Sequence, residues 1–156
     1  VYKPSGDGTV NWSTFVGIEL NGTGFEMRYF SNLYYDQKWN DKWRTIAGFD
    51  IGNQELSNKQ SATWLSPVFI AQYSINPKWQ AAFRTEYYQD KKNVIIATSD
   101  TFEAFGFSFN VDYLPNSKVK FRNEARYMNS KNNVFADASS LVPSTLFWTT
   151  SLSFEF

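Results

Sequence analysis

The chain has 156 residues, of which 15 are basic, 15 are acidic and 19% are aromatic, and it contains neither cysteine nor histidine. Without cysteine there are no disulfides or thiolate metal sites, and without histidine there is no zinc–histidine chemistry or histidine general base. The zero net charge gives no basic footprint for nucleic acid, and no apolar run approaches the roughly 18 residues of a membrane helix.

The first part of the chain predicts an irregular segment followed by a strand. Residues 1–11 contain a proline, two glycines and an aspartate, a composition typical of a loop or an irregular lead-in. From Trp12 to Leu20 apolar and polar side chains alternate, except that Phe15 falls on the polar side, and we predict a strand. The sequence Asn21-Gly22-Thr23-Gly24 predicts a tight turn after it.

Sharper alternation follows this turn, and a period of two residues is the mark of a half-buried strand. Seven further strands are predicted at residues 25–36, 43–54, 65–75, 79–88, 104–113, 119–127 and 146–156. Pro67 lacks an N–H group, which indicates a bulge or a position near the start of its strand. In the last strand, aromatic and aliphatic residues occupy one face, and Phe147 is the exception on the other. The chain therefore predicts about eight strands in a single domain over residues 1–156.

The predicted connections alternate in length. Turns of three or four residues are predicted around Asn40, Pro77 and Asn116, and longer loops at residues 55–63, 90–101 and 131–144. The second loop contains the apolar run Val94-Ile95-Ile96-Ala97, which could extend the strands. Short turns on one side and long loops on the other are typical of outer-membrane barrels, with the short turns facing the periplasm. We therefore predict an all-β fold, an antiparallel up-and-down transmembrane β-barrel.

The apolar face of these strands is expected to meet lipid. Aromatic residues near the strand ends are expected to form girdles at the membrane interfaces. The candidates are Trp39, Trp43, Trp79, Tyr113, Trp148 and Phe154. A carbohydrate- or ligand-binding role for these aromatics is the alternative, and the lipid-facing interpretation is favoured.

The polar face is expected to form the wall of the lumen. The charged candidates are Arg28, Arg44, Asp50, Arg84, Glu86, Asp112, Lys120, Arg122, Glu124 and Arg126. These side chains could line a pore and set its selectivity, or they could form cross-strand ion pairs that fill a narrow, closed lumen. The residues leave both interpretations open. The strand from Lys120 to Arg126 is the best candidate for a basic track, although Arg84 and Glu86 could neutralise much of it.

No motif predicts catalysis. The sequence shows no nucleophile motif, no glycine-rich phosphate loop and no calcium loop, and no spacing of carboxylates singles out an acid–base pair. We therefore predict no catalytic residue, metal site or cofactor.

Six segments carry motifs that recur in one family of proteins, at residues 32–36, 40–43, 48–52, 83–91, 110–113 and 124–131. Through them the chain resembles, over about residues 25–156, the putative beta-barrel porin-2 (OmpL-like) outer-membrane proteins of Bacteroidetes-type bacteria. The most specific features are Arg84-Thr85-Glu86-Tyr87-Tyr88-Gln89-Asp90-Lys91 and Arg126-Tyr127-Met128-Asn129-Ser130-Lys131 before a final aromatic strand. The resemblance implies an outer-membrane porin with no agreed binding residues. Its members are longer than 156 residues, so we expect this chain to be the C-terminal portion of a larger barrel.

The leading prediction is a weakly selective channel in the bacterial outer membrane for small hydrophilic solutes or ions. The alternative is a small closed barrel of about eight strands, acting as an anchor or as a subunit of an outer-membrane complex. Eight strands leave no open pore, so strand number separates the two. The second alternative is a soluble, lipocalin-like ligand-binding barrel with the aromatics inside. Expected partners are outer-membrane lipids, other outer-membrane proteins, and the barrel-assembly machinery, for which Phe156 would be the recognition signal.

Overall fold

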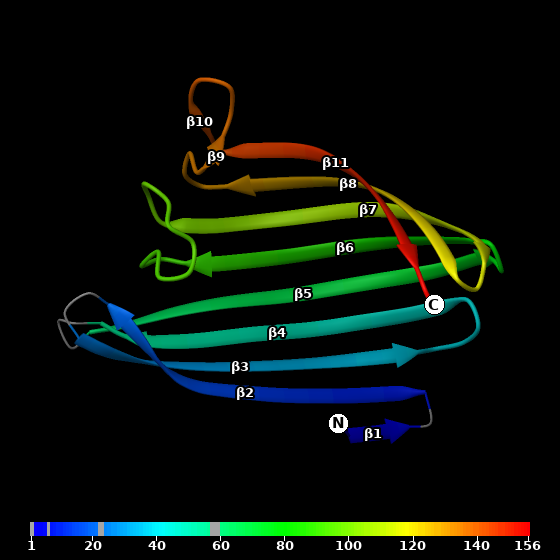
Figure 1. The fold of residues 1–156 in the computed structure, drawn as a ribbon, viewed down its shortest axis with the longest axis horizontal. Coiled ribbons are helices and arrows are strands. Elements are labelled where there is room, and N and C mark those ends of the chain that lie inside the picture. The colour runs from blue at the N-terminus through cyan, green and yellow to red at the C-terminus, as the bar shows by residue number, and fades with distance from the viewer. Residues whose placement is uncertain (1, 6, 22–23, 57–59) are drawn as a thin grey trace.

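A computed structural model of the chain describes residues 2–5, 7–21, 24–56 and 60–156. Nine of its strands form one antiparallel sheet in the order β1-β2-β3-β4-β5-β6-β7-β8-β11 (Figure 1). A short β1 (Tyr2–Ser5) precedes eight long strands: β2 (Gly8–Asn21), β3 (Gly24–Lys38), β4 (Trp43–Glu55), β5 (Ser61–Asn76), β6 (Trp79–Asp90), β7 (Phe102–Asn116), β8 (Val119–Ser130) and β11 (Ser144–Phe154). The remaining two described strands, β9 (Phe135–Ala136) and β10 (Leu141–Val142), form a separate hairpin.

The eight long strands are the eight predicted from alternation, and the up-and-down order is confirmed. The expectation of a loop over residues 1–11 is wrong for the described part of that segment, which contains β1 and the start of β2. Thr9 and Asn11 lie opposite Asp36 and Tyr34 of β3, and the Asn11 amide donates to the Tyr34 hydroxyl at 2.8 Å. Polar residues are compatible with a strand here because they fall on the polar side of the sheet. The tight turn predicted at residues 21–24 lies partly outside the described residues.

Two of the predicted loops differ from the structure. The loop expected at residues 55–63 is shorter, because β4 continues to Glu55 and β5 begins at Ser61. Ala62 and Trp64, at the start of β5, are buried opposite Gln54 and Gly52, and this packing extends the pairing beyond the point where alternation fades. The loop expected at residues 131–144 contains the hairpin β9–β10. The loop after β6 is confirmed at residues 91–101, and its apolar run Val94–Ala97 does not extend a strand.

Three short turns lie at one end of the sheet, and each is stabilised by the side chain of an asparagine (Figure 1). The side-chain oxygens of Asn40, Asn76 and Asn116 each accept the backbone N–H of the lysine two residues later, at 2.9 Å. An asparagine that bonds the backbone two residues ahead mimics a turn, and this local chemistry explains why three Asn-x-Lys sequences reverse the chain. The two long connections, residues 91–101 and 131–143, lie at the opposite end.

The sheet has two chemically different faces. We call the face that carries Arg84, Asp112 and Arg122 the polar face, and the opposite one the apolar face. Every buried side chain described in the long strands lies on the polar face, and burial along β7 alternates residue by residue from Phe102 to Asp112. Most exposed large apolar side chains lie on the apolar face, with Phe15 and Phe147 as exceptions on the polar face.

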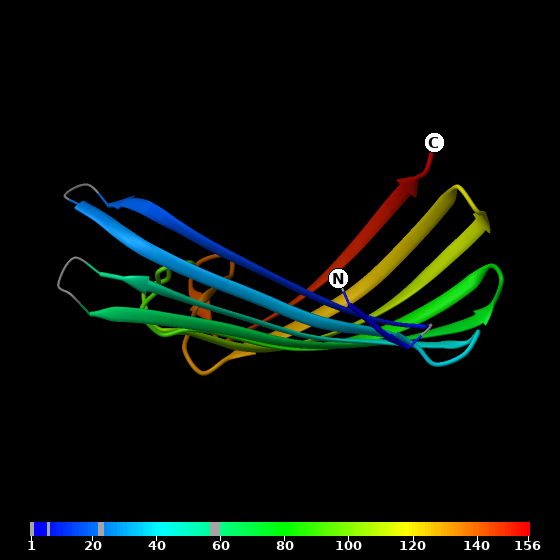
Figure 2. The same cartoon turned by 90° about the horizontal axis from the view of Figure 1, so that it is seen from below.

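The sheet is twisted and does not close into a barrel (Figure 2). Among the described residues, β11 pairs only with β8, and β1 pairs only with β2, so the two edges remain separate. No helix in the described part of the chain has the length and apolar character needed to cross a membrane.

Candidate functional site: the polar face of the sheet

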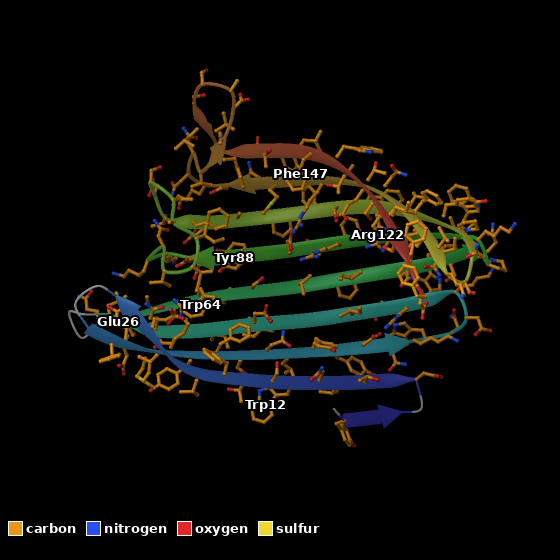
Figure 3. All side chains as sticks on the ribbon, in the orientation of Figure 1. Trp12, Glu26, Trp64, Tyr88, Arg122 and Phe147 are labelled. Atoms are coloured by element: carbon orange, nitrogen blue, oxygen red, sulfur yellow. The ribbon has the colours of Figure 1, made fainter. Side chains whose placement is uncertain are left out.

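The strand register places all ten predicted lumen-wall residues on the polar face. They come from β3, β4, β6, β7 and β8, and cross-strand pairing groups most of them into small ion-pair clusters. Figure 3 shows that the clusters spread along the sheet, with Glu26 and Trp64 toward the long-loop end and Arg122 toward the short-turn end.

The first cluster joins two arginines to one carboxylate. Arg84 Nη2 lies 2.5 Å from Glu86 Oε2, and Arg126 pairs with the other carboxylate oxygen, although β7 separates their strands. Glu86 can cross β7 because the residue opposite it there is Gly106, where an added Cβ would lie 3.2 Å from Glu86 Oε1. The Nε atoms of both arginines are buried without a hydrogen-bond partner among the described residues. One carboxylate therefore faces two guanidinium groups.

The second cluster surrounds Asp112 of β7. Arg122 donates to it in a bidentate manner: its Nε atom lies 2.7 Å from Oδ1 and its Nη2 atom lies 2.7 Å from Oδ2. The Asn110 amide adds a 2.8 Å bond, and Lys120 Nζ lies 4.0 Å away. Charge-assisted bidentate bonds of this kind fix geometry strongly. Asp112 is thus a buried anchor that holds two cations at the surface of the sheet.

The third cluster lies between β2 and β5 near the long-loop end. Arg28 Nε donates to the Gln54 side-chain oxygen at 2.7 Å, and Arg28 Nη1 lies 2.8 Å from Glu19. The Gln54 amide in turn donates to Glu26 at 2.8 Å. The Arg28 guanidinium also sits 5.7 Å from the Trp64 ring centroid, close enough for a cation–π contact.

The remaining predicted lumen-wall residues have simpler surroundings. Arg44 pairs with Asp36 of the adjacent strand, and Asp50 accepts a hydrogen bond from Asn32. Glu124 forms no hydrogen bond or ion pair with any residue that the structure describes. Across the same part of the chain, no three acidic side chains gather closely enough to hold a metal ion.

Side chains at the long-loop end of the polar face hold the two long loops in place, and the sequence analysis did not predict these contacts. The fully buried Asp90 carboxylate accepts the backbone N–H groups of Val94, Ile95 and Ile96 at 3.1, 2.7 and 2.9 Å. Asn132 of the second loop donates to the carbonyl and hydroxyl oxygens of Thr101 at 3.1 and 2.7 Å, which ties the two loops together.

A small apolar core secures this arrangement. It consists of Phe102, Ala104 and Val134, against which Tyr88, Ile96, Met128 and Phe135 pack. The apolar run Val94–Ala97 was the sequence feature that could have indicated this core. Part of the run packs against the sheet instead of extending a strand.

Aromatic side chains form a band on the apolar face at the short-turn end. Ring centroids lie 4.8 Å apart for Trp43–Tyr73, 4.7 Å for Trp79–Tyr113 and 6.3 Å for Tyr113–Phe121. Tyr73 was not among the predicted interface aromatics, although its position opposite Trp43 follows from the strand register.

The other interface candidates lie in three different places. Trp39 lies at the turn, where its indole N–H donates to the Thr45 hydroxyl at 2.8 Å, and Phe154 lies near the end of β11. Trp148 lies in the middle of β11, opposite Ala125, and Phe156 is fully exposed beyond the strand.

The Lys38–Asp41 pair at the first short turn has shifted pKa values. Lys38 Nζ donates to the Asp41 carboxylate at 2.9 Å, and this bond lowers the pKa of Asp41 and raises the pKa of Lys38 from their ordinary values. Both side chains are exposed, so the pair marks the rim of the sheet and contributes little to its stability.

Comparison with known proteins gives one result. A family model described as putative beta-barrel porin-2, OmpL-like, matches residues 1–156. The match includes residues 1–24, so the similarity is longer than the segment from residue 25 that the motifs indicated. No curated protein and no solved structure matches the chain.

Proposed function

The chain belongs to the putative beta-barrel porin-2, OmpL-like family, and from this premise we propose that it forms the wall of an outer-membrane diffusion channel. The channel would pass small hydrophilic solutes or ions, with the polar face toward water and the apolar face toward lipid. Outer-membrane lipids and the barrel-assembly machinery are the proposed partners.

The observation that carries this proposal is the distribution of charge and aromatic residues between the two faces. Charged clusters lie on one face and an aromatic band lies on the other. A transmembrane barrel has this arrangement, with an outward apolar band flanked by aromatic residues and a polar interior. A soluble ligand-binding barrel would need the reverse, with the aromatics inside, and the exposed aromatic face argues against it.

The free edge of β11 favours a wide barrel over a small closed one. The backbone bonds Glu155 N–H to Lys118 O and Ser130 N–H to Pro143 O show that odd-numbered residues of β11 bond to β8. The backbone groups of Leu146, Trp148, Thr150, Leu152 and Phe154 therefore point away from β8, toward the open edge. Lipid provides no hydrogen bonds, so an unpaired edge is not viable within a membrane. We propose that further strands pair with this edge and complete a barrel of more than eight strands.

The test of the channel is single-channel conductance of the full-length protein in a planar bilayer. We expect discrete, stable openings, because a barrel wider than eight strands leaves an aqueous pore. The same preparation after heat unfolding is the control. Silence from protein that migrates as a folded barrel on a gel would contradict the proposal and support the closed-barrel alternative.

A further inference from the structure

We infer that the part of the polar face formed by β6, β7 and β8 is an anion path, at which small anions are favoured over cations. The path is defined by four side chains, Arg84, Lys120, Arg122 and Arg126, which we call the cation row. The inference rests on the proposed function, because a path for anions requires that the polar face meets water.

The cation row is not fully neutralised by the acids that hold it. Glu86 is shared by Arg84 and Arg126, and Asp112 is shared by Arg122 and Lys120. Each of these two clusters therefore carries one excess positive charge. Glu124, the other acid between these cations, makes no bond to a described residue and offsets one charge. Around the cation row, four cations therefore face three carboxylates. The fourth acid on this face of β6–β8, Asp90, is fully buried at the long-loop end, where three backbone N–H groups of the loop stabilise its charge. The wall around the cation row is therefore positive.

The excess of positive charge is larger at the surface of the wall, because the cations are more exposed than the carboxylates that bind them. The side chains of Glu86 and Asp112 are only 10% and 3% exposed, whereas those of Arg84, Lys120 and Arg122 are 39%, 40% and 39% exposed. Arg126 is intermediate at 25%. The carboxylates lie against the sheet, beneath the cations that they bind. Over these two clusters a passing solute therefore meets guanidinium and ammonium groups before it meets a carboxylate, whereas Glu124, between Arg122 and Arg126 on β8, is itself partly exposed.

The cation row also extends along the direction of transport. Lys120, Arg122 and Arg126 lie on the same face of β8, and six residues of strand span about 20 Å. At the tilt of about 35–45° that strands have in a membrane barrel, this length corresponds to about 15 Å of the roughly 25 Å height of the apolar band. An anion could thus move between neighbouring cations across more than half of that height.

The opposite side of the same face provides an internal contrast. In the third cluster the carboxylate is the more exposed partner, with Glu19 at 43% and Arg28 at 22%. Asp50, nearby on β4, accepts a hydrogen bond from the Asn32 amide and forms an ion pair with no cation in the described part of the chain. The electrostatic potential should therefore change sign between β2–β4 and β6–β8.

The chain has no cysteine, so a cysteine introduced into it is the only thiol of this segment. With any cysteine elsewhere in the full-length protein replaced by serine, single cysteines report the local potential in the folded protein. Ser151→Cys lies on the polar face opposite Arg122, and Ser13→Cys lies opposite Asn32, the partner of Asp50. The measurement is the rate ratio of a negatively to a positively charged methanethiosulfonate reagent, each normalised to a free thiol. We expect a ratio above one for Ser151→Cys and below one for Ser13→Cys.

Charge changes on either side of the reporter test the cause. Lys120 and Glu124 lie opposite Ser153 and Thr149, two residues to each side of Ser151. In the Ser151→Cys background, Lys120→Gln should lower the ratio about fourfold in low salt, and Glu124→Gln should raise it about fourfold. One unit charge about 8 Å away in water changes each rate about twofold, in opposite directions for the two reagents. Lys78→Gln, in the exposed turn after β5, is the matched control and should leave the ratio unchanged.

The outcomes separate the anion path from the channel. Equal ratios at the two cysteines, or a ratio insensitive to both Lys120→Gln and Glu124→Gln, would overturn the anion path and leave the channel intact. Failure of Ser151→Cys to react with either reagent in folded protein would overturn both, because the polar face would then be closed to water.

Discussion

Two glycines of the polar face are needed because large side chains lie over them. A Cβ added to Gly52 would come within 2.0 Å of the Trp64 ring, and one added to Gly106 within 3.2 Å of Glu86. Trp64 is rigid and buried, whereas the neighbour of Gly106 is the end of a flexible side chain. Gly52 is therefore the position that tolerates substitution less well.

We expect Gly52→Ala to destabilise the folded barrel by about 1–3 kcal/mol, the range for overpacking a filled site. The measurement is the temperature at which the folded band converts to the unfolded band on a denaturing gel. Gly106→Ala should have a smaller effect, since Glu86 can move. In a Trp64→Leu background, adding Gly52→Ala should bring little further loss. An equal loss in both backgrounds would show that the Trp64 ring is not the cause.

At the scale of the element, the short turns and the long loops are ordered by different means. Each short turn is held by one asparagine side chain and its neighbouring backbone, so a few residues determine it. The loop after β6 is instead held by Asp90, which binds three consecutive N–H groups, and by the second loop through Asn132. Removing one side chain should therefore release a whole loop.

Asp90→Ala should loosen residues 91–101 without unfolding the sheet. Hydrogen bonds to a charged group contribute roughly 1.5–3 kcal/mol, so losing even one such bond should increase loop opening by at least about tenfold. The measurement is the rate of tryptic cleavage after Lys91 and Lys92 in the folded protein. Asp100→Ala is the control, because its carboxylate accepts only the adjacent Thr101 N–H among the described bonds. An unchanged cleavage rate in Asp90→Ala would contradict this account of the loop.

At the scale of the whole molecule, the open edge of β11 determines which barrel can form. If another strand pairs there, Thr150→Pro removes a backbone N–H that this strand needs, and the folded barrel should be lost or strongly reduced. If the edge stays free, proline is tolerated, as on edge strands generally. Heat-modifiable mobility of the protein extracted from outer membranes measures the outcome.

Two matched variants make this test specific. Thr150→Val keeps the N–H but removes the hydroxyl that bonds Asn123 at 2.8 Å, so it isolates the loss of that bond. Ser151→Pro disrupts pairing with β8 and should prevent folding in either case. A Thr150→Pro variant that assembles as well as Thr150→Val would argue against further strands at this edge.

The eight long strands, their antiparallel order and the assignment of each face were determined by the sequence itself. A period of two residues is a local property, so alternation from Phe25 to Phe154 places Arg84 and Phe83 on opposite faces without any tertiary information. The Asn-x-Lys turns are local as well. Alternation also placed all ten predicted lumen-wall residues on the polar face.

Only the tertiary structure decided which of those residues meet and how deeply they lie. Arg126 reaches Glu86 across β7 because Gly106 leaves room between them, and this contact depends on a register over three strands. Strand pairing likewise made residues 8–11 part of β2, although their composition is typical of a loop. Burial of Asp112 beneath Arg122 sets which charge faces outward. Alternation determines on which face of the sheet a side chain lies. Its partners come from neighbouring strands, and the local two-residue period of one strand carries no information on how that strand pairs with the next.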